Sequence, residues 1–78
     1  MFLNVKIITN RQDFSVLETD ERTINTNAIA LITTVNGQYS FKERTINVNK
    51  VRLIDGDIIS VIGEFVYNNG EITGIIDK

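Results

Sequence analysis

The clearest pattern in the chain is KVRLIDGDIISVIGEFVYNNGEITGIIDK, residues 50–78. Two turn signals, IDGD at 54–57 and NNG at 68–70, separate runs that are rich in isoleucine and valine. Because glycine and asparagine tolerate positive φ, both signals predict tight turns between strands. We expect residues 58–67 to form one long strand in which Gly63 marks a bend or a close backbone approach. This part of the chain therefore predicts a curled sheet.

The rest of the chain has the same strand period. Apolar residues recur at every second position in the runs NVKIIT, DFSVLET, NAIALIT and QYSFKER. Asn36-Gly37 predicts a hairpin that joins the third of these runs to the fourth. Two alternatives are open for residues 45–54: a short helix capped by Asn47 or Asn49, or a strand followed by a bend. Without proline or a linker, residues 1–78 are expected to form a single all-β domain.

The composition narrows the class of function. The chain has 78 residues and contains no cysteine, histidine or tryptophan, so disulfides, ordinary zinc sites and the usual nucleophile and base pairs are not available. We expect no enzyme, no metal site and no cofactor. The first residues, MFLNVKIITN, have neither the basic start nor the long apolar run of a signal peptide or membrane span. A cytoplasmic protein with no membrane partner is the expectation.

The charge is unevenly distributed. The net charge is −2, which argues against a protein that holds duplex DNA by bulk electrostatics. Residues 42–54, however, contain four cations and one carboxylate, so this segment alone has a charge of +3. A local groove for a nucleic-acid strand remains compatible with this distribution.

A short repeat is also present. ERTINTNAIALI at 21–32 and ERTINVNKVRLI at 43–54 are identical at eight of twelve positions. Neither the flanking residues nor a third copy extends the match, as a repeat architecture would require. We interpret the copies as two similar transitions from a strand to a connector and not as a duplicated module.

Residues 50–78 resemble the second half of nucleic-acid-binding OB-folds. The pattern G-D-x-φ-x-φ-x-G is matched by Gly56, Asp57, Ile59, Val61 and Gly63, followed by Phe65. The order of the earlier runs is similar to that of the single-stranded DNA-binding proteins. The resemblance implies a five-stranded, closed or partly open barrel, with or without one short helix before the fourth strand. Because tryptophan and the acidic tail of bacterial members are missing, it implies a reduced type such as phages and mobile elements carry.

Such a protein needs aromatic rings to stack on bases and cations to bind phosphates. Tyr39 and Phe41 share a face of the predicted third strand, and Tyr39 is expected to reach solvent because of its hydroxyl, whereas Phe41 could equally lie in the core. The candidate nucleic-acid-binding residues are Tyr39, Phe41, Lys42, Arg44, Lys50, Arg52 and Tyr67. The expected partner is single-stranded DNA or RNA, with DNA favoured.

Both faces of the predicted fourth strand are apolar. Ile58, Ile62 and Val66 share its outer face, and an apolar outer face predicts an interface in a homo-oligomer or with a protein partner. The alternative function is therefore a small β-barrel protein-interaction module, such as a phage-encoded inhibitor or an assembly subunit, that binds no nucleic acid.

Overall fold

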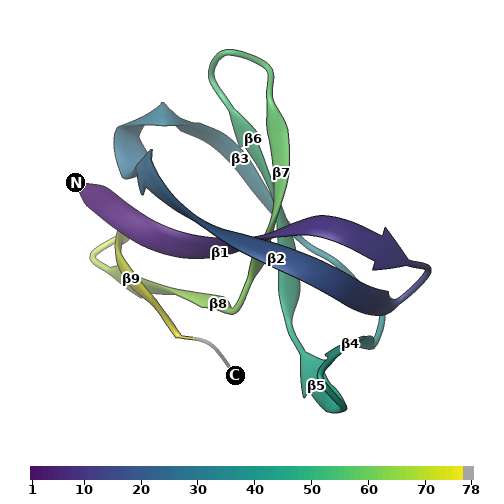
Figure 1. The fold of residues 1–78 in the computed structure, drawn as a ribbon. Helices are drawn as coiled ribbons and strands as arrows, with labels where there is room; N and C mark the ends of the chain where they lie inside the picture. Colours follow the sequence, from purple (N-terminus) through teal and green to yellow (C-terminus); the bar gives the residue numbers. More distant parts are fainter. Residues whose placement is uncertain (77–78) are drawn as a thin grey trace.

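The computed structural model describes residues 1–76, and within them the chain is all-β, as predicted (Figure 1). Nine strands and one 3-10 turn are present in this part of the chain. The strands are β1 (Phe2–Gln12), β2 (Ser15–Asn25), β3 (Ile29–Thr34), β4 (Tyr39–Phe41), β5 (Arg44–Ile46), β6 (Val48–Leu53), β7 (Ile58–Ile62), β8 (Glu64–Asn68) and β9 (Glu71–Ile76), and the turn η1 spans Thr26–Ala28.

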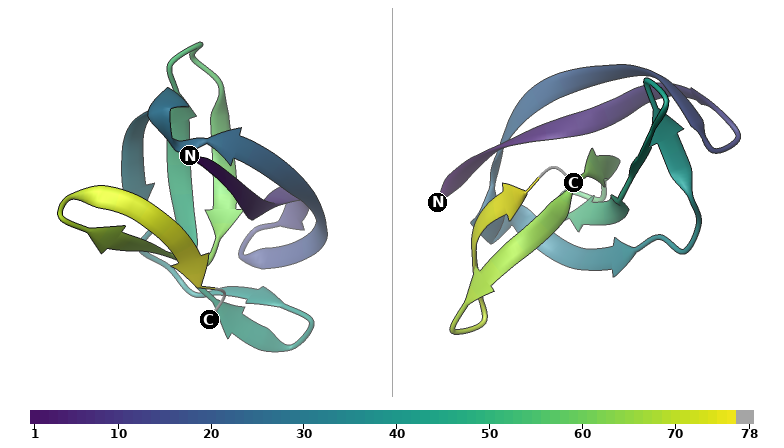
Figure 2. Two further views of the ribbon diagram at one scale, coloured as in Figure 1. Left: turned by 90° about the vertical axis from the view of Figure 1, so that its left-hand side faces the viewer. Right: turned by 90° about the horizontal axis from the view of Figure 1, so that it is seen from below.

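Seven strands form one sheet in the order β3-β6-β7-β1-β2-β4-β5, and β8 and β9 form a separate hairpin. All neighbours in the large sheet are antiparallel except β2 and β4, which pair in parallel through Ser15 and Ser40. The large sheet curls strongly (Figure 2). It does not close into a barrel within residues 1–76, so the five-stranded barrel expected from the resemblance is not confirmed.

One face of the large sheet, here the inner face, holds the main core. Alternate residues of β1, β6 and β7 point to this face, and the β8–β9 hairpin covers it through Phe65, Ile72 and Ile75. The buried members of this core are Val5, Ile7, Ile24, Val51, Ile59, Val61 and Phe65. Strands with an apolar face on one side bury it against a second layer, and the hairpin supplies that layer.

The opposite, outer face holds a second, smaller core. Its buried members are Val16, Tyr39, Ile46, Val48 and Ile62, with Ile8, Val35 and Phe41 packed against them. The short β4–β5 hairpin contributes Tyr39, Phe41 and Ile46, and therefore covers this end of the outer face. Both faces of the sheet carry apolar residues, and each is covered by a hairpin: the inner face by β8–β9 and one end of the outer face by β4–β5.

Gly63 forms the corner between the two sheets. Its φ is 116°, a value that L side chains rarely adopt. Its N–H donates to the carbonyl oxygen of Asn47 (2.8 Å) and its carbonyl oxygen accepts from Nδ2 of Asn49 (2.7 Å). The expected long strand 58–67 therefore ends at Gly63 and continues as β8 in the other sheet. The expectation of a bend at this glycine is confirmed.

Two of the three predicted turns are present. IDGD at 54–57 joins β6 to β7, with Gly56 at φ 96°, and NNG at 68–70 joins β8 to β9, with Asn69 and Gly70 both at positive φ. The hairpin predicted at Asn36-Gly37 is wrong, because β3 pairs with β6 and not with β4. Residues 35–38 instead carry the chain from β3, at one edge of the large sheet, to β4, next to the strand at its other edge.

The helix alternative for residues 45–54 is also wrong, because these residues form β5 and β6. Strand β6 (Val48–Leu53) pairs with β3 on one side and with β7 on the other. Backbone pairing on both sides overrides the weak local capping signal. No helix in residues 1–76 is long and apolar enough to cross a membrane.

The two copies of the repeat have different surroundings. Ile24 of the first copy is buried in the main core, whereas Ile46 of the second is buried in the outer-face core. The first copy ends β2 and leads into η1, while the second forms β5 and leads directly into β6. The copies therefore share a strand end with one buried isoleucine, followed by a different connector.

Candidate nucleic-acid interface

The β1–β2 turn and strand β4, which are distant in the sequence, meet on the outer side of the sheet. The parallel pairing of Ser15 with Ser40 places the β1–β2 turn beside β4. The N–H of Ser40 donates to the carbonyl oxygen of Phe14 at 2.8 Å. Residues 11–14 and 39–42 consequently form one surface.

An aromatic and cationic cluster results from this contact. The rings of Phe14 and Tyr39 meet edge to face, with centroids 5.2 Å apart and an interplanar angle of 77°. Cζ of Arg11 lies 5.6 Å from the Tyr39 centroid, and Nζ of Lys42 lies 5.2 Å from the Phe41 centroid. Both distances are typical of cation–π contacts. We call Arg11, Phe14, Tyr39, Phe41 and Lys42 the hairpin cluster.

Tyr39 supports this cluster and does not offer a free ring. Only 7 % of the residue is exposed, because it lies opposite Ile46 in the β4–β5 pairing and packs into the outer-face core. The expectation that Tyr39 reaches solvent is therefore wrong. Burial of the large ring in a small core outweighs the preference of its hydroxyl for water.

Phe14 is the accessible ring that the sequence patterns did not single out. It is 53 % exposed at the end of the β1–β2 turn. No clear signal of this exposure is present in the sequence, because Phe14 and Val16 lie two positions apart in the run DFSVLET, as residues on one strand face do. Phe41 is half-buried, because one side of it packs on the outer-face core.

Gly37 lies close to the ring of Phe14. A Cβ atom at this position would lie 2.9 Å from Cε1 of Phe14. Such a separation is too short for two carbon atoms in van der Waals contact. Two features therefore favour glycine at this position without a hairpin turn: its φ of 153° and the close approach of the Phe14 ring.

The tip of the β4–β5 hairpin is strained. Lys42 and Glu43 have φ values of 52° and 62°, the left-handed region in which two-residue hairpin turns favour asparagine and glycine. Strained residues of this kind cluster at functional sites. The turn directs the exposed Lys42 toward Phe41, and Arg44 follows it, exposed and paired with Phe41 across the hairpin.

Lys50 and Arg52 are exposed on the outer face beyond the second core. Alternation along β6 places them on the same face as Val48. The register aligns Thr33, Lys50 and Ser60 in one row across β3, β6 and β7, and Leu31, Arg52 and Ile58 in the next. We call these six residues the open rows, because the β4–β5 hairpin does not contribute a strand neighbour to them.

Tyr67 is exposed by 55 % but lies away from this surface. It belongs to β8 and lines a cleft of about 260 Å³ together with Ile32, Thr34, Asn49, Glu64 and Phe65. Phe65 is a member of the inner-face core, so this cleft is on the opposite side of the sheet from the outer-face core. The seven predicted binding residues are therefore not one site: the structure gathers six on the outer side and separates Tyr67.

The predicted interface residues are also divided. Ile58 is 64 % exposed in an open row, whereas Ile62 is only 3 % exposed and belongs to the outer-face core. Val66 is half-buried in the other sheet. Ile58 and Ile62 share the outer face of β7 as predicted, but the β4–β5 hairpin covers Ile62. Val66 does not share this face, because the chain turns at Gly63 into the other sheet.

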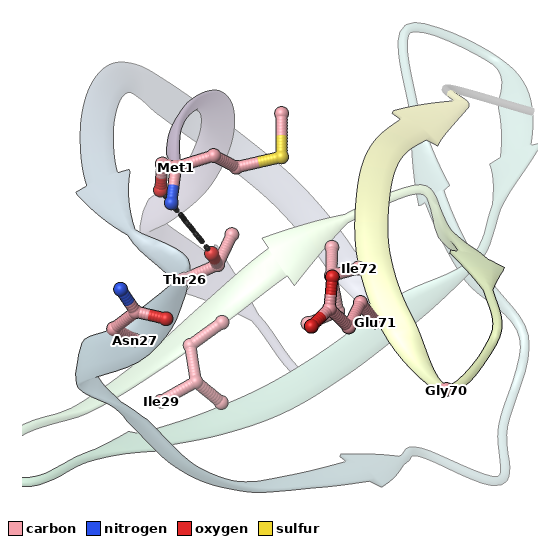
Figure 3. Close-up of a pocket in the computed structure, with 7 residues that line it drawn as sticks. All are labelled: Met1, Thr26, Asn27, Ile29, Gly70, Glu71 and Ile72. Carbon is pink, nitrogen blue, oxygen red and sulfur yellow. Dashed lines mark hydrogen bonds between the residues drawn. The ribbon is translucent and has the colours of Figure 1, made fainter.

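A further cleft is lined by residues from both ends of the chain and from η1 and β3 (Figure 3). It measures about 290 Å³ and is lined by Met1, Thr26, Asn27, Ile29, Gly70, Glu71 and Ile72. The terminal amine of Met1 donates to Oγ1 of Thr26 at 3.3 Å. None of the residues predicted to bind nucleic acid lines this cleft.

Comparison with known proteins gives no match: no protein-family model, no curated protein and no solved structure is similar enough to assign the chain.

Proposed function

We propose that the protein is a non-catalytic binder of single-stranded nucleic acid, with DNA favoured over RNA. The observation that carries the proposal is the position of the cations. Six of the eight lysines and arginines surround the outer-face core, on the same side as two accessible aromatic rings. These cations are Lys6, Arg11, Lys42, Arg44, Lys50 and Arg52.

The residues have separate roles in this proposal. Phe14 and Phe41 stack on bases, while Lys42 and Arg44 bind phosphates beside them. Lys50 and Arg52 continue the cationic surface along the open rows. Tyr39 holds Phe14 and Arg11 in place, and Tyr67 has no role because it lies on the other side of the sheet.

The net charge of −2 does not oppose this function, since a nucleic-acid strand responds to the local potential. Several carboxylates lie away from the outer-face core: Asp55 and Asp57 in the β6–β7 turn, and Glu64 and Glu71 on the β8–β9 hairpin. The finer fold assignment, a reduced OB-fold-like barrel of the phage or mobile-element type, is part of the proposal and rests on residues 50–78.

The test is fluorescence anisotropy with labelled single-stranded DNA and RNA at several salt concentrations. For single strands, log K falls with log salt by about 0.7 per neutralised phosphate. The double substitution Lys50→Gln with Arg52→Gln should therefore reduce the salt slope by about 1.4. Arg22→Gln is the matched control, because Arg22 is exposed but pairs with Val5 of β1, away from the outer-face core.

A second pair of variants tests the aromatic contacts. Phe14→Ala should weaken binding about 5- to 150-fold, the loss expected for one stacked base. Tyr67→Ala is the control, since Tyr67 is equally exposed but lies outside the proposed surface. Equal losses for the two variants, or no binding at low salt, would refute the proposed site.

One observation favours the alternative, a protein-interaction module. Leu31 and Ile58 are 50 % and 64 % exposed and flank Arg52 in an open row. An exposed apolar pair around one arginine is typical of a protein-binding surface. Absence of nucleic-acid binding in the anisotropy test would make this alternative the better one.

A further inference from the structure

β3 forms one edge of the large sheet, and its backbone is paired on one side only. Its single strand partner among residues 1–76 is β6. The N–H of Val35 donates to the carbonyl oxygen of Val48, which identifies these two as a hydrogen-bonded pair. In an antiparallel ladder such pairs alternate. The N–H and C=O groups of Ile32 and Thr34 consequently point away from β6, toward the free edge.

Apart from an irregularity near its start, between Ile29 and Leu31, this edge lacks the features by which proteins normally prevent strand addition. Exposed edges are usually protected by charged residues, proline or short length. β3 is six residues long, and the chain contains no charged residue and no proline between residues 23 and 41. The opposite edge, β5, has only three residues and includes Arg44. β3 is therefore the edge that is open to another strand.

We infer that β3 pairs antiparallel with β3 of a second copy of this chain. Each copy has a net charge of −2, so two copies meet at lowest electrostatic cost through a segment without charge. A two-fold axis makes the strand its own partner. On the inner side, a cleft of about 260 Å³ lies between Ile32 and Thr34 of β3 and Tyr67 of β8.

The symmetry of this pairing has a consequence for the outer face. A two-fold axis that continues an antiparallel sheet is perpendicular to that sheet, so the same face of both copies points to the same side. The open rows, with Lys50 and Arg52, would then extend across the dimer as one surface. A role of this continuous surface in binding a nucleic-acid strand rests on the proposed function, whereas the dimer itself does not.

The test is sedimentation velocity over a series of protein concentrations, with a pair of charge variants. Leu31 and Thr33 are exposed and lie on the edge strand. One variant carries Leu31→Lys with Thr33→Lys, and the other carries Leu31→Glu with Thr33→Glu. The Lys variant alone places like charges opposite each other across the axis and should weaken the dimer about tenfold or more. The Glu variant should weaken it less, because residues 31 and 33 lie opposite Arg52 and Lys50 of the same copy, which partly neutralise the new carboxylates. An equimolar mixture should restore it.

The matched control is Thr45→Lys, an exposed position on the other edge strand, which should leave the dimer unchanged. Circular dichroism of each variant establishes that it is folded. A wild-type protein that stays monomeric at all concentrations, a mixture that fails to restore the dimer, or equal disruption by Thr45→Lys would overturn the inference. Oligonucleotide binding is measured separately, so failure of the dimer and failure of the proposed function are distinguishable.

Discussion

Gly63→Ala should be the most destabilising of the glycine substitutions in this chain. A Cβ atom at Gly63 would lie 2.6 Å from the carbonyl oxygen of Ile76 and 3.1 Å from Cγ1 of Ile75. Both neighbours belong to β9, and the closer atom is backbone, which cannot rotate away. The substitution therefore forces the β8–β9 hairpin away from the corner.

The magnitude has two parts. A non-glycine residue at the observed φ of 116° costs about 1 to 3 kcal/mol. Displacing packed neighbours to make room for the added methyl group costs a further 1 to 3 kcal/mol, roughly. The sum is about 2 to 6 kcal/mol, a large part of the roughly 4 to 12 kcal/mol expected for a domain of this size.

Two other glycines separate these contributions. Gly56 has a positive φ of 96° but no atom within 4 Å of its Cβ position, so Gly56→Ala measures backbone strain alone. Gly74 has neither feature, and Gly74→Ala should change stability by less than about 1 kcal/mol. The comparison of these variants with Gly63→Ala isolates the cost of the contact with β9.

The assay is urea unfolding followed by circular dichroism, with the midpoint and slope fitted for each variant. The expected order of stability is Gly74→Ala, then Gly56→Ala, then Gly63→Ala. If Gly63→Ala is no less stable than Gly56→Ala, the close approach of β9 to the corner is not present in solution, and the reasoning about the corner fails.

Two further predictions use the same unfolding assay. Lys42→Asn with Glu43→Gly should stabilise the protein by about 1 kcal/mol, because both residues have positive φ in a turn that favours Asn-Gly; a loss of stability would contradict the turn geometry. Asn49→Ala should cost about 1 to 3 kcal/mol, since the buried Asn49 amide donates to the Gly63 carbonyl oxygen. An Asn49→Ala variant as stable as wild type would show that this hydrogen bond contributes nothing.

The sequence was sufficient to predict the elements whose signals are local. The all-β class, the turns at 54–57 and 68–70 and the bend at Gly63 follow from strand period and from residues that tolerate positive φ. These features depend on a few neighbouring residues, and the structure has them where the patterns place them.

Strand pairing could not be predicted in the same way. The Asn36-Gly37 signal favours pairing of the strands on either side, yet β3 pairs with β6, whose residues 48–53 follow a further hairpin. The choice is decided by where the apolar side chains are buried: Ile32 packs into the main core, whereas Tyr39 packs into the core on the other face. Two cores on opposite faces are a tertiary property that period and turn signals do not contain.

The candidate site depends on the same tertiary choice. Arg11 and Lys42 lie far apart in the sequence, yet each stacks on one of two rings that are two residues apart. They meet because the β4–β5 hairpin docks beside β2, where its ladder contact is the single pair Ser15 and Ser40. With so little backbone pairing, burial of Tyr39 and Ile46 must provide most of the free energy of docking. Replacing Tyr39 would therefore disturb the fold of the site, whereas replacing the exposed Phe14 tests its function.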